Sequence, residues 1–565
     1  MAQKKVKKIL ALMAALTMSA GMAASFAGCS QTSGGGGSES KSEGSSAASS
    51  TESKADSSAA SSAASSSTEK ADSGYKIEVL KLQSEGDFGG PNPFRSMSRG
   101  PGYIKMQHVF DSLLEEGDED YCPWLAESWS LSDDKLEYTF TLHKDATWHD
   151  GKPVTTADVA FSIDYYAKHP NTAGNGNLGA EDDYIVDKYT IKDDYTIVVK
   201  MKKALTTNTS NIGGIPIIPK HVWEKVDDPY EYDGDDQYIG CGMYKFVSYD
   251  SAAGTYQFEA YDKYYGHKAG AHYIDYAMVS DPILAFDNGD LSITNVTADL
   301  YDKYNARDDI AMIPESDEMG SSLMMNMEKV KEFQDVKVRQ ALYHALDRQK
   351  MVDSVYQGLG HVASAAYVPQ TNPYYCDNVE TYDYDVEAAK EVLEPLNLNL
   401  RLVVGEDFPG AATLAEIIKM NLEAAGVKVE MESYDVSTRD EMVAKGDYDL
   451  VLNYHGGWNS KPDSFLKTQY GMPAGTQSKW VPKGWENKEL QKKINALFTE
   501  FDNDKLKEKL DEIQIDISKE VPIIHLITQV SYGMYHPDEY DCWQANFGTS
   551  MYANCRQSYT SDSKF

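Results

Sequence analysis

The chain has few cysteines, six among 565 residues. Apart from Cys29 they are Cys122, Cys241, Cys376, Cys542 and Cys555, an odd number that contains no C-x-x-C spacing. This usage excludes a disulfide framework as the source of stability. Cys542 and Cys555 form the one sequence-close couple, and a bond between them remains open.

Catalytic signatures are also missing. The sequence has no H-E-x-x-H, Walker A or G-x-S-x-G pattern. His143 with His149, or His267 with His272, are conceivable metal-ligand pairs, but residues 267 and 272 do not align on one helix face. We therefore predict that the protein is not an enzyme and holds no metal or cofactor.

The His149-Asp150-Gly151 stretch places an imidazole beside a carboxylate, which invites a catalytic interpretation. The Asp-Gly pair is typical of a tight turn. Thr155 and Asp158 then form a capping-box pattern for a helix that follows. Since adjacent turn residues rarely face each other, we interpret this stretch as structural.

Positive charge is scarce, with 53 Lys and Arg against 88 Asp and Glu, a formal net charge of -35. So acidic a surface repels phosphate backbones, which excludes nucleic acid as a partner. A hydrophobic content of 41% in a chain of this length indicates a soluble protein of two or three lobes.

Only one long apolar run is present, at the N-terminus. Four lysines in the first eight residues precede an apolar stretch from about Ile9 to Ala24, and "SFAGC" closes it at Cys29. This pattern predicts a secretory signal over residues 1–28. The F-A-G-C ending resembles a bacterial lipobox, so Cys29 is predicted to be lipidated; an ordinary signal peptide or an uncleaved anchor helix is the alternative. Ser30 to Gly74, rich in Ser, Gly and Ala, is predicted to be a disordered tether.

The body from Tyr75 onward alternates strand and helix patterns. "VKVRQALYHALDRQKMVDSVY" has helical spacing, with Asp335 as its N-cap. "LNLRLVV" near Leu398 predicts a strand, followed by a helix that Gly426 ends, the strand "VKVEMESY", a helix near residues 439–444, and the strand "YDLVLNY". This β-α-β-α-β order predicts a parallel sheet.

The loop from Tyr454 to Asp463 leaves the carboxyl end of the last of these strands, where open parallel sheets bind ligands. Gly456 and Gly457 let a ligand approach bare backbone, and Trp458 offers a rigid aromatic face. We predict a binding surface that contains Tyr454, His455, Gly456, Gly457, Trp458, Asn459 and Asp463. A structural role for the indole is the alternative.

Several long motifs occur in a fixed order: "PWLAESW" (123–129), "IPIIPKHVWEKVDDP" (215–229), "YIGCGMYKFVSYD" (238–250), "KVRQALYHALDRQKMVDSVYQGLG" (337–360) and "DEIQIDISKEVPIIHL" (511–526). Together with the "HDG" turn they resemble extracellular solute-binding proteins of family 5, the oligopeptide, dipeptide and nickel binders of ABC importers. The likeness spans the chain after the tether.

The resemblance implies an α/β, two-lobed periplasmic-binding-protein-like clamp (type II, cluster C) with an extra subdomain in the first lobe. The expected boundaries are lobe I at 75–118, 237–321 and 521–565, the extra subdomain at 119–236, and lobe II at 322–520. Two crossing strands, near "SSLMMNM" and "VPIIHL", would join the lobes and permit hinge closure.

The implied function is capture of a small solute between the lobes and its delivery to a membrane permease. Peptide-binding members have an aspartate in the loop that holds the ligand ammonium; aligned on Pro462, Trp458 stands there instead, so Asp463 or a carboxylate of the other lobe would have to replace it. Oligosaccharide is an alternative solute that suits an indole with Asn459, and a nickel chelate is a further one. Four more residues are expected to contact the ligand: Asn326, Phe88, Phe94 and Tyr374.

The expected partners are therefore a small solute, permease subunits and the membrane that a lipid anchor reaches. We expect a monomer on the extracellular face of the bacterial cell membrane. From other classes, a secreted hydrolase would need a carboxylate pair or a nucleophile with its base. A surface adhesin would bind its target without closing on a small molecule.

Overall fold

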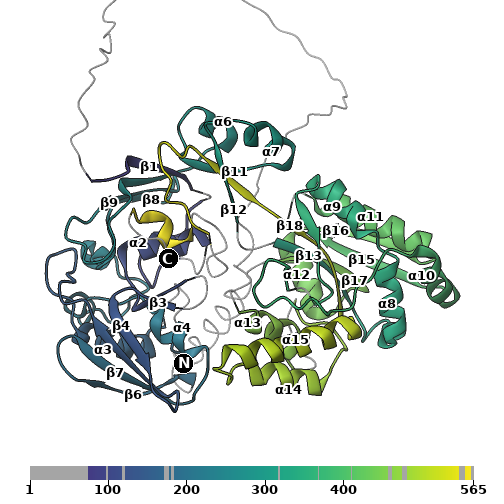
Figure 1. Cartoon of the computed structure of the whole chain (residues 1–565), viewed down its shortest axis with the longest axis horizontal. Helices are drawn as coiled ribbons and strands as arrows, with labels where there is room; N and C mark the ends of the chain where they lie inside the picture. The colour runs from purple at the N-terminus through teal and green to yellow at the C-terminus, as the bar shows by residue number, and fades with distance from the viewer. Residues whose placement is uncertain are drawn as a thin grey trace, which may run out of the picture.

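The computed structural model describes residues 74–84, 86–96, 100–117, 121–170, 177–179, 183–315, 319–366, 368–406, 408, 410–455, 461–473, 480–545 and 554–561. These residues form two α/β lobes that lie side by side (Figure 1). The predicted signal, Cys29 and nearly all of the tether lie outside them. Across the described ranges, none of the helices combines the length and the apolar character needed to cross a bilayer.

The first lobe is built on a four-stranded sheet in the order β1-β10-β9-β8, in which β1 is parallel to β10 and the other pairs are antiparallel. Its elements are β1 (Ile77–Gln83), α2 (Gly100–Val109), β8 (Tyr244–Asp250), β9 (Thr255–Ala260) and β10 (Ala271–Ala277). Strict alternation along β9 buries Tyr256, Phe258 and Ala260. Gly240 lies so close to the end of α2 that a Cβ would come within 1.8 Å of the Val109 carbonyl oxygen.

The extra subdomain is an antiparallel sheet in the order β4-β5-β7-β6, packed with α3. Its elements are β4 (Ala126–Leu131), β5 (Glu137–Leu142), α3 (Thr156–Lys168), β6 (Val186–Ile191) and β7 (Thr196–Met201). The predicted capping box of Thr155 and Asp158 is confirmed at the start of α3. The subdomain shares one continuous hydrophobic core with the first sheet, through buried rings such as Tyr138 and Trp223.

The "HDG" stretch forms the predicted turn, with Gly151 at φ +84°. His149 places Nε2 2.9 Å from the carbonyl oxygen of Gly242, and burial lowers the pKa of this imidazole to about 4. Its role is to join the subdomain to the main sheet of the first lobe.

Three short elements connect the subdomain with the sheet and reach toward the second lobe: the hairpin of β2 (Leu114–Glu116) and β3 (Tyr121–Pro123), followed later in the chain by α4 (Asn208–Gly213) and α5 (Lys220–Trp223).

The second lobe contains a six-stranded sheet in the order β14-β18-β13-β17-β15-β16. Its strands are β13 (Met319–Met325), β14 (Gly360–Val362), β15 (Asn399–Gly405), β16 (Lys428–Tyr434), β17 (Leu450–His455) and β18 (Ile523–Gln529). The three strands of the predicted β-α-β-α-β unit, β15 to β17, are parallel as expected. The expectation of a wholly parallel sheet is wrong, because β13 runs antiparallel to both of its neighbours and β14 is antiparallel to β18.

Helices cover this sheet: α8 (Val336–His344), α9 (Arg348–Tyr356), α10 (Val386–Leu393), α11 (Ala411–Ala424) and α12 (Val436–Lys445). Asp335 caps α8 as predicted, through a bond from the Lys337 amide. The continuous helix expected there is in fact two, because Asp347 accepts from the Lys350 amide and starts α9.

The lobes are joined where β12 continues into β13 and β18 continues into β19 (Figure 1). On the first-lobe side, β11 (Ile293–Val296), β12 (Ala311–Pro314) and β19 (Tyr532–Tyr535) form a small sheet in the order β11-β19-β12, beside α6 (Pro282–Asp287) and α7 (Ala298–Asn305). The amide of Glu315 donates to the carbonyl oxygen of Ser531 over 2.9 Å, so the two connections lie side by side. We call these paired connections the hinge, because paired strands between lobes permit hinge closure.

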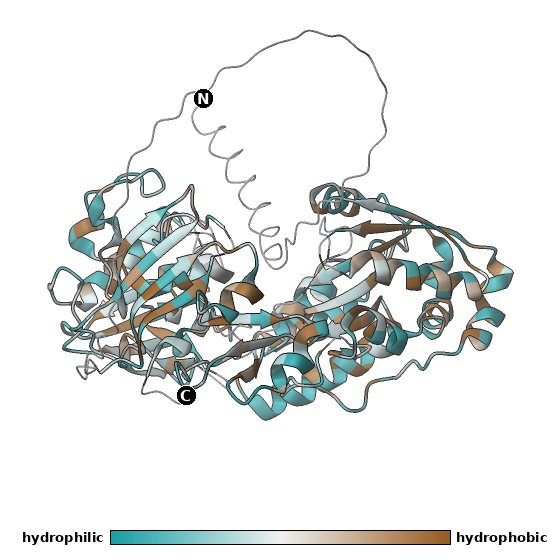
Figure 2. Ribbon diagram, turned by 90° about the horizontal axis from the view of Figure 1, so that it is seen from above, coloured by the Kyte–Doolittle hydropathy of each residue, from teal (hydrophilic) through white to brown (hydrophobic). Residues whose placement is uncertain are grey.

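Two of the expected boundaries fall at strands of the second-lobe sheet. β13 starts at Met319, before the expected start of lobe II at residue 322, and β18, which follows the expected boundary at 521, pairs with β13 and β14. β18 is a central strand there, paired on both edges and buried at six of its seven positions. Figure 2 shows hydrophobic colour in the interior of each lobe, and the two main clusters of buried residues are separate, as a clamp requires.

Candidate functional site: a pocket between the lobes

The lobes touch again below the hinge, where the extra subdomain meets one corner of the second lobe. That corner consists of α13 (Asp463–Leu466), α14 (Lys488–Leu497) and α15 (Asn503–Glu520). The amide of Thr206 donates to the carbonyl oxygen of Phe498 over 2.9 Å, and Leu205 packs against the second-lobe core. This contact therefore brings together residues that are distant in the chain.

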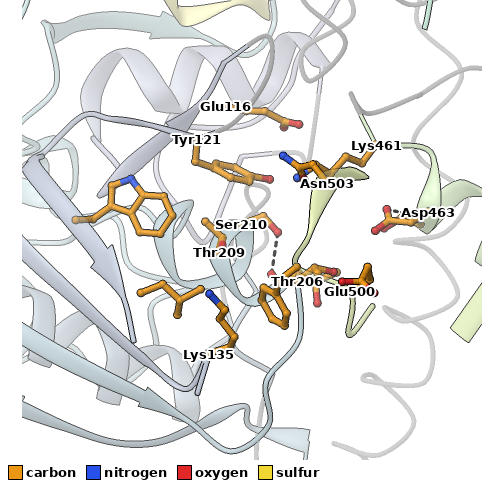
Figure 3. A pocket seen from close by; sticks show the side chains of 15 residues that line it. Glu116, Tyr121, Lys135, Thr206, Thr209, Ser210, Lys461, Asp463, Glu500 and Asn503 are labelled. Carbon is orange, nitrogen blue, oxygen red and sulfur yellow. Dashed lines mark hydrogen bonds between the residues drawn. The ribbon is translucent and has the colours of Figure 1, made fainter. Parts of the chain in front are cut away.

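A cavity of about 220 Å³ lies at this contact, and both lobes line it (Figure 3). The first lobe contributes Glu116, Tyr121, Trp129, Leu131, Lys135, Thr206, Thr207, Thr209 and Ser210. The second lobe contributes Lys461, Asp463, Ser464, Glu500, Phe501 and Asn503. We call this cavity the interlobe pocket.

Local structure explains why the first-lobe residues converge. Glu116 and Tyr121 are direct cross-strand partners in the β2–β3 hairpin. Gly213, at the end of α4, lies so close that a Cβ would come within 2.8 Å of the Leu114 side chain, and this close approach holds α4 against the hairpin. Thr209 and Ser210, on the same helix, therefore reach the pocket that the hairpin lines.

Carboxylates and amines enter the pocket from both lobes (Figure 3). Glu116 and Lys135 come from the first lobe, and Lys461 and Asp463 from the second. The negative charge of Glu500 is balanced by Lys509, whose Nζ lies 2.6 Å from the Glu500 carboxylate. The pocket thus offers both signs of charge on each side, which is the arrangement that complements a zwitterion.

Asp463 is the most enclosed acid on the second-lobe side, with 7% of its surface exposed. Burial raises the pKa of its carboxyl, while the Ser464 amide and the Lys461 charge act in the opposite direction. The Ser464 amide donates to Oδ1 over 2.6 Å, which orients the carboxyl group at the start of α13.

The α4 side of the pocket is rich in hydroxyls. Ser210 donates to the Thr207 carbonyl oxygen over 2.9 Å, and Thr209 Oγ1 lies 3.3 Å from the Tyr138 hydroxyl. Thr206 Oγ1 is buried and has no hydrogen-bond partner in the described part of the chain. A buried hydroxyl in this state favours a polar guest beside it.

Among the site residues predicted from sequence, the structure brings Asp463 into the interlobe pocket. Tyr454, the penultimate residue of β17, stacks on Phe408 with ring centroids 4.3 Å apart and donates to Gln529 Oε1 over 3.3 Å. The backbone of His455 pairs with Gly320. The His455 side chain and the predicted contacts Gly456, Gly457, Trp458 and Asn459 lie outside what the structure describes.

Four other predicted contacts do not line the interlobe pocket. Asn326 lies at the opposite end of the sheet, where its amide donates to the carbonyl oxygens of Gly446 and Tyr448 and accepts from two backbone amides, so it fixes a second-lobe loop. Phe94 is 3% exposed and packs against Trp223 within the first-lobe core.

Phe88 and Tyr374 also serve the scaffold. Phe88 lies over Lys105, whose Nζ is 4.9 Å from its ring centroid, and its amide donates to the Tyr256 hydroxyl. Tyr374 packs against the second-lobe core, and its carbonyl oxygen accepts from Gln514 of α15 over 2.8 Å.

Sequence reasoning missed the α4 residues and the corner at residues 500–503. The run "LTTNTSN" (205–211) was a usable signal, because four hydroxyl residues within seven positions are unusual in a segment that precedes the buried stretch "IGGIP". The corner at 500–503 had no local signal, since only the tertiary contact between lobes brings it to the pocket.

The described residues contain no group of three or more His, Cys, Asp or Glu placed to hold a metal ion. The five cysteines that the structure describes are free thiols, so Cys542 and Cys555 are not bonded to each other.

Comparisons with known proteins agree with this architecture. The family model described as "Bacterial extracellular solute-binding proteins, family 5 Middle" matches residues 120–477. Heme-binding protein A of Haemophilus influenzae is 25% identical over 78% of this chain and 85% of that protein. The dipeptide-binding protein of Escherichia coli is 26% identical over 73% of this chain and 83% of that protein. The solved structure of the oligopeptide-binding protein AppA from Bacillus subtilis, in complex with a nonapeptide, superposes with a TM-score of 0.64 at 20% identity, over 85% of this chain and 98% of that one.

Proposed function

Because the chain belongs to the bacterial extracellular solute-binding proteins of family 5, we propose that it is the lipid-anchored receptor of an ABC importer and captures peptides with free termini. Capture takes place in the interlobe pocket, and closure of the second lobe on the first encloses the ligand. The ligand selects the closed form because only that form contacts it from both sides.

The observation that carries peptide as the solute is the charge pattern of the interlobe pocket. In this proposal Asp463, which lines the pocket, receives the peptide ammonium group, the role for which Trp458 provides no carboxylate. Lys461 and Lys135, which also line the pocket, receive the terminal carboxylate. A charge-assisted hydrogen bond to each terminus favours the binding of a peptide over that of a neutral solute of similar size. The name of the Escherichia coli relative, a dipeptide-binding protein, supports the same class.

The decisive experiment uses a mixed pool of short peptides and mass spectrometry of those that the purified protein retains. The best peptide is then titrated calorimetrically into the native protein and into Asp463→Asn, an isosteric change that removes the charge. We expect affinity to fall roughly tenfold or more, about 1.4 kcal/mol per tenfold. The matched control is the same peptide with an acetylated amino terminus. It should bind both proteins equally; an equal loss for both peptides would contradict the ammonium role.

Oligosaccharide is the second candidate solute. Its support is that the hydroxyls of Thr206, Thr209 and Ser210 line the same pocket as the rings of Tyr121 and Trp129. Such rings offer flat amphipathic faces, and the protein hydroxyls can form hydrogen bonds with the hydroxyls of a sugar. A parallel thermal-shift screen with oligosaccharides and nickel chelates separates these classes: a shift with sugars and none with the peptide pool would replace the peptide proposal.

Cys29 is the proposed lipidation site, and residues 30–74 are the proposed tether that holds the body near a permease. In cells, Cys29→Ser should move the protein from the membrane fraction into the medium and abolish incorporation of a labelled fatty acid. Membrane retention of this variant would favour an uncleaved anchor helix. We propose a monomeric body, which light scattering of the secreted variant tests.

A further inference from the structure

A second cavity, of about 300 Å³, lies within the first lobe and shares no lining residue with the interlobe pocket. Five rings line it: Trp124, His143, Tyr264, Tyr265 and His267. They come from three separate places in the chain, namely the end of β3, the end of β5 and the loop between β9 and β10. We call these five residues the aromatic box.

The rings contact one another. The centroids of Tyr264 and Tyr265 are 4.6 Å apart, those of His143 and Tyr265 are 5.0 Å apart, and those of Trp124 and His267 are 5.5 Å apart. The rings meet at angles between 39° and 45°, so they form a concave wall rather than a flat stack.

A buried carboxylate fixes three of the five rings. Asp111, 1% exposed, accepts from Trp124 Nε1 over 3.0 Å and from the hydroxyl of Tyr264 over 3.1 Å. The hydroxyl of Tyr265 donates to the same carboxylate. Because the hydroxyls of Tyr264 and Tyr265 are tied to Asp111 behind the wall, these two rings present their π-faces and edges to the cavity and are preorganised for a guest. The Trp124 ring already carries a cation, since the Arg556 guanidinium carbon lies 4.9 Å from its centroid.

The charges around the aromatic box are mostly negative. Arg556 pairs with both Asp111 and Glu115, so one guanidinium faces two buried carboxylates. The charges of Glu127 and Asp145 raise the pKa of the His143 imidazole, while burial, the larger effect, lowers it. A neutral imidazole at neutral pH leaves the wall without a positive charge there.

We propose that the aromatic box binds a small organic cation of the methylated-ammonium type. The faces of aromatic rings attract such cations within about 6 Å, and cages of several rings are the known means of recognising a quaternary ammonium. The same lobe already holds a cation in this way: Lys105 Nζ lies 4.1 Å from the Tyr276 centroid, 4.9 Å from Phe88 and 5.0 Å from Tyr256. This site is distinct from the interlobe pocket, and the proposal does not depend on which solute that pocket takes.

The test is calorimetric titration of the full mature protein with choline and, in parallel, with 3,3-dimethylbutan-1-ol, which has the same shape without the charge. Choline should bind at least roughly tenfold more tightly than the neutral alcohol. Equal binding of the two, no binding of choline, or preferential binding of indole or of Ni²⁺ would each overturn the proposal.

A matched pair of variants tests whether choline binding depends on the aromatic ring of Tyr264. Tyr264→Phe and Tyr264→Leu both lose the hydrogen bond to Asp111, so the effect of losing that bond is shared between them. Only Tyr264→Phe keeps a π-face, and we expect it to retain choline binding while Tyr264→Leu loses roughly tenfold. Asp463→Asn, in the interlobe pocket, should leave choline affinity unchanged. An equal loss in both Tyr264 variants, or a loss in Asp463→Asn, would show that choline does not bind at the aromatic box.

Discussion

Removing the charge of Arg556 should destabilise the first lobe in a manner that depends on pH. This side chain is 4% exposed; its Nη1 lies 3.2 Å from Asp111 Oδ1 and its Nε lies 3.2 Å from Glu115 Oε2. Its guanidinium carbon is also 4.9 Å from the Trp124 ring centroid. Arg556→Met keeps much of the side-chain volume but leaves two buried carboxylates without a countercharge. Breaking a buried pair in this way costs about 3 to 5 kcal/mol.

The pH dependence follows from the carboxyl pKa values. Burial raises the pKa of Asp111 to about 6 and raises that of Glu115, and Arg556 opposes both shifts. Since the folded-state pKa lies above the unfolded value, the folded protein binds protons more readily, and stability from these groups increases as pH falls through the folded pKa. Without Arg556 both pKa values rise further. The loss in Arg556→Met should therefore be largest near neutral pH and smaller at about pH 5.5.

Urea unfolding followed by tryptophan fluorescence measures this effect, and hydrogen exchange localises it to β2 and residues 554–561. The matched control is the triple variant Arg556→Met, Asp111→Asn, Glu115→Gln, which removes all three charges and should recover much of the lost stability. An identical deficit at both pH values, or a triple variant no more stable than the single one, would refute the reasoning.

Other predictions test the scaffold. His149→Phe should lessen the loss of stability on acidification, because a folded pKa of about 4, below the ordinary 6.5, costs up to about 2 kcal/mol by about pH 5; unfolding midpoints at two pH values check this. Gly240→Ala should lower stability by roughly 3 kcal/mol, as its Cβ would overlap the Val109 carbonyl oxygen; an unchanged melting temperature would contradict the geometry. Asp347→Ala should cost about 1 kcal/mol through loss of the α9 cap, measured by denaturation beside Asp347→Asn, which keeps a capping oxygen. The thiol of Cys542, with its pKa raised to about 11 by burial, should react with iodoacetamide only slowly in the folded protein and quickly in urea.

Local signals in the sequence predicted the elements that local chemistry controls. The capping box at Thr155, the cap at Asp335 and the parallel β15 to β17 unit follow from short-range hydrogen bonding and hydrophobic spacing, and all three are confirmed. The break before α9 was missed because the hydrophobic spacing continues across Asp347, although the side chain itself is a good helix cap.

Long-range pairing determines the features that local signals could not predict. β18 is apolar enough to be a central strand of either lobe, and only its partners β13 and β14 place it in the second. Phe94 follows a loop expected at the cleft, but four surrounding rings draw it into the core. In the candidate site, Asp463 was predicted from its loop. Glu500 and the α4 hydroxyls lie beside it only because the two lobes touch, and no periodic pattern in the sequence indicates that contact.

Capture between closing lobes is tested most directly by small-angle X-ray scattering of the mature protein, alone and saturated with its tightest peptide from the pool. The segment before Tyr75 is common to both samples, so the difference reports on the lobes. We predict a smaller radius of gyration in the saturated sample, because the ligand holds the second lobe against the first. Calorimetric saturation with an unchanged scattering curve would contradict the account.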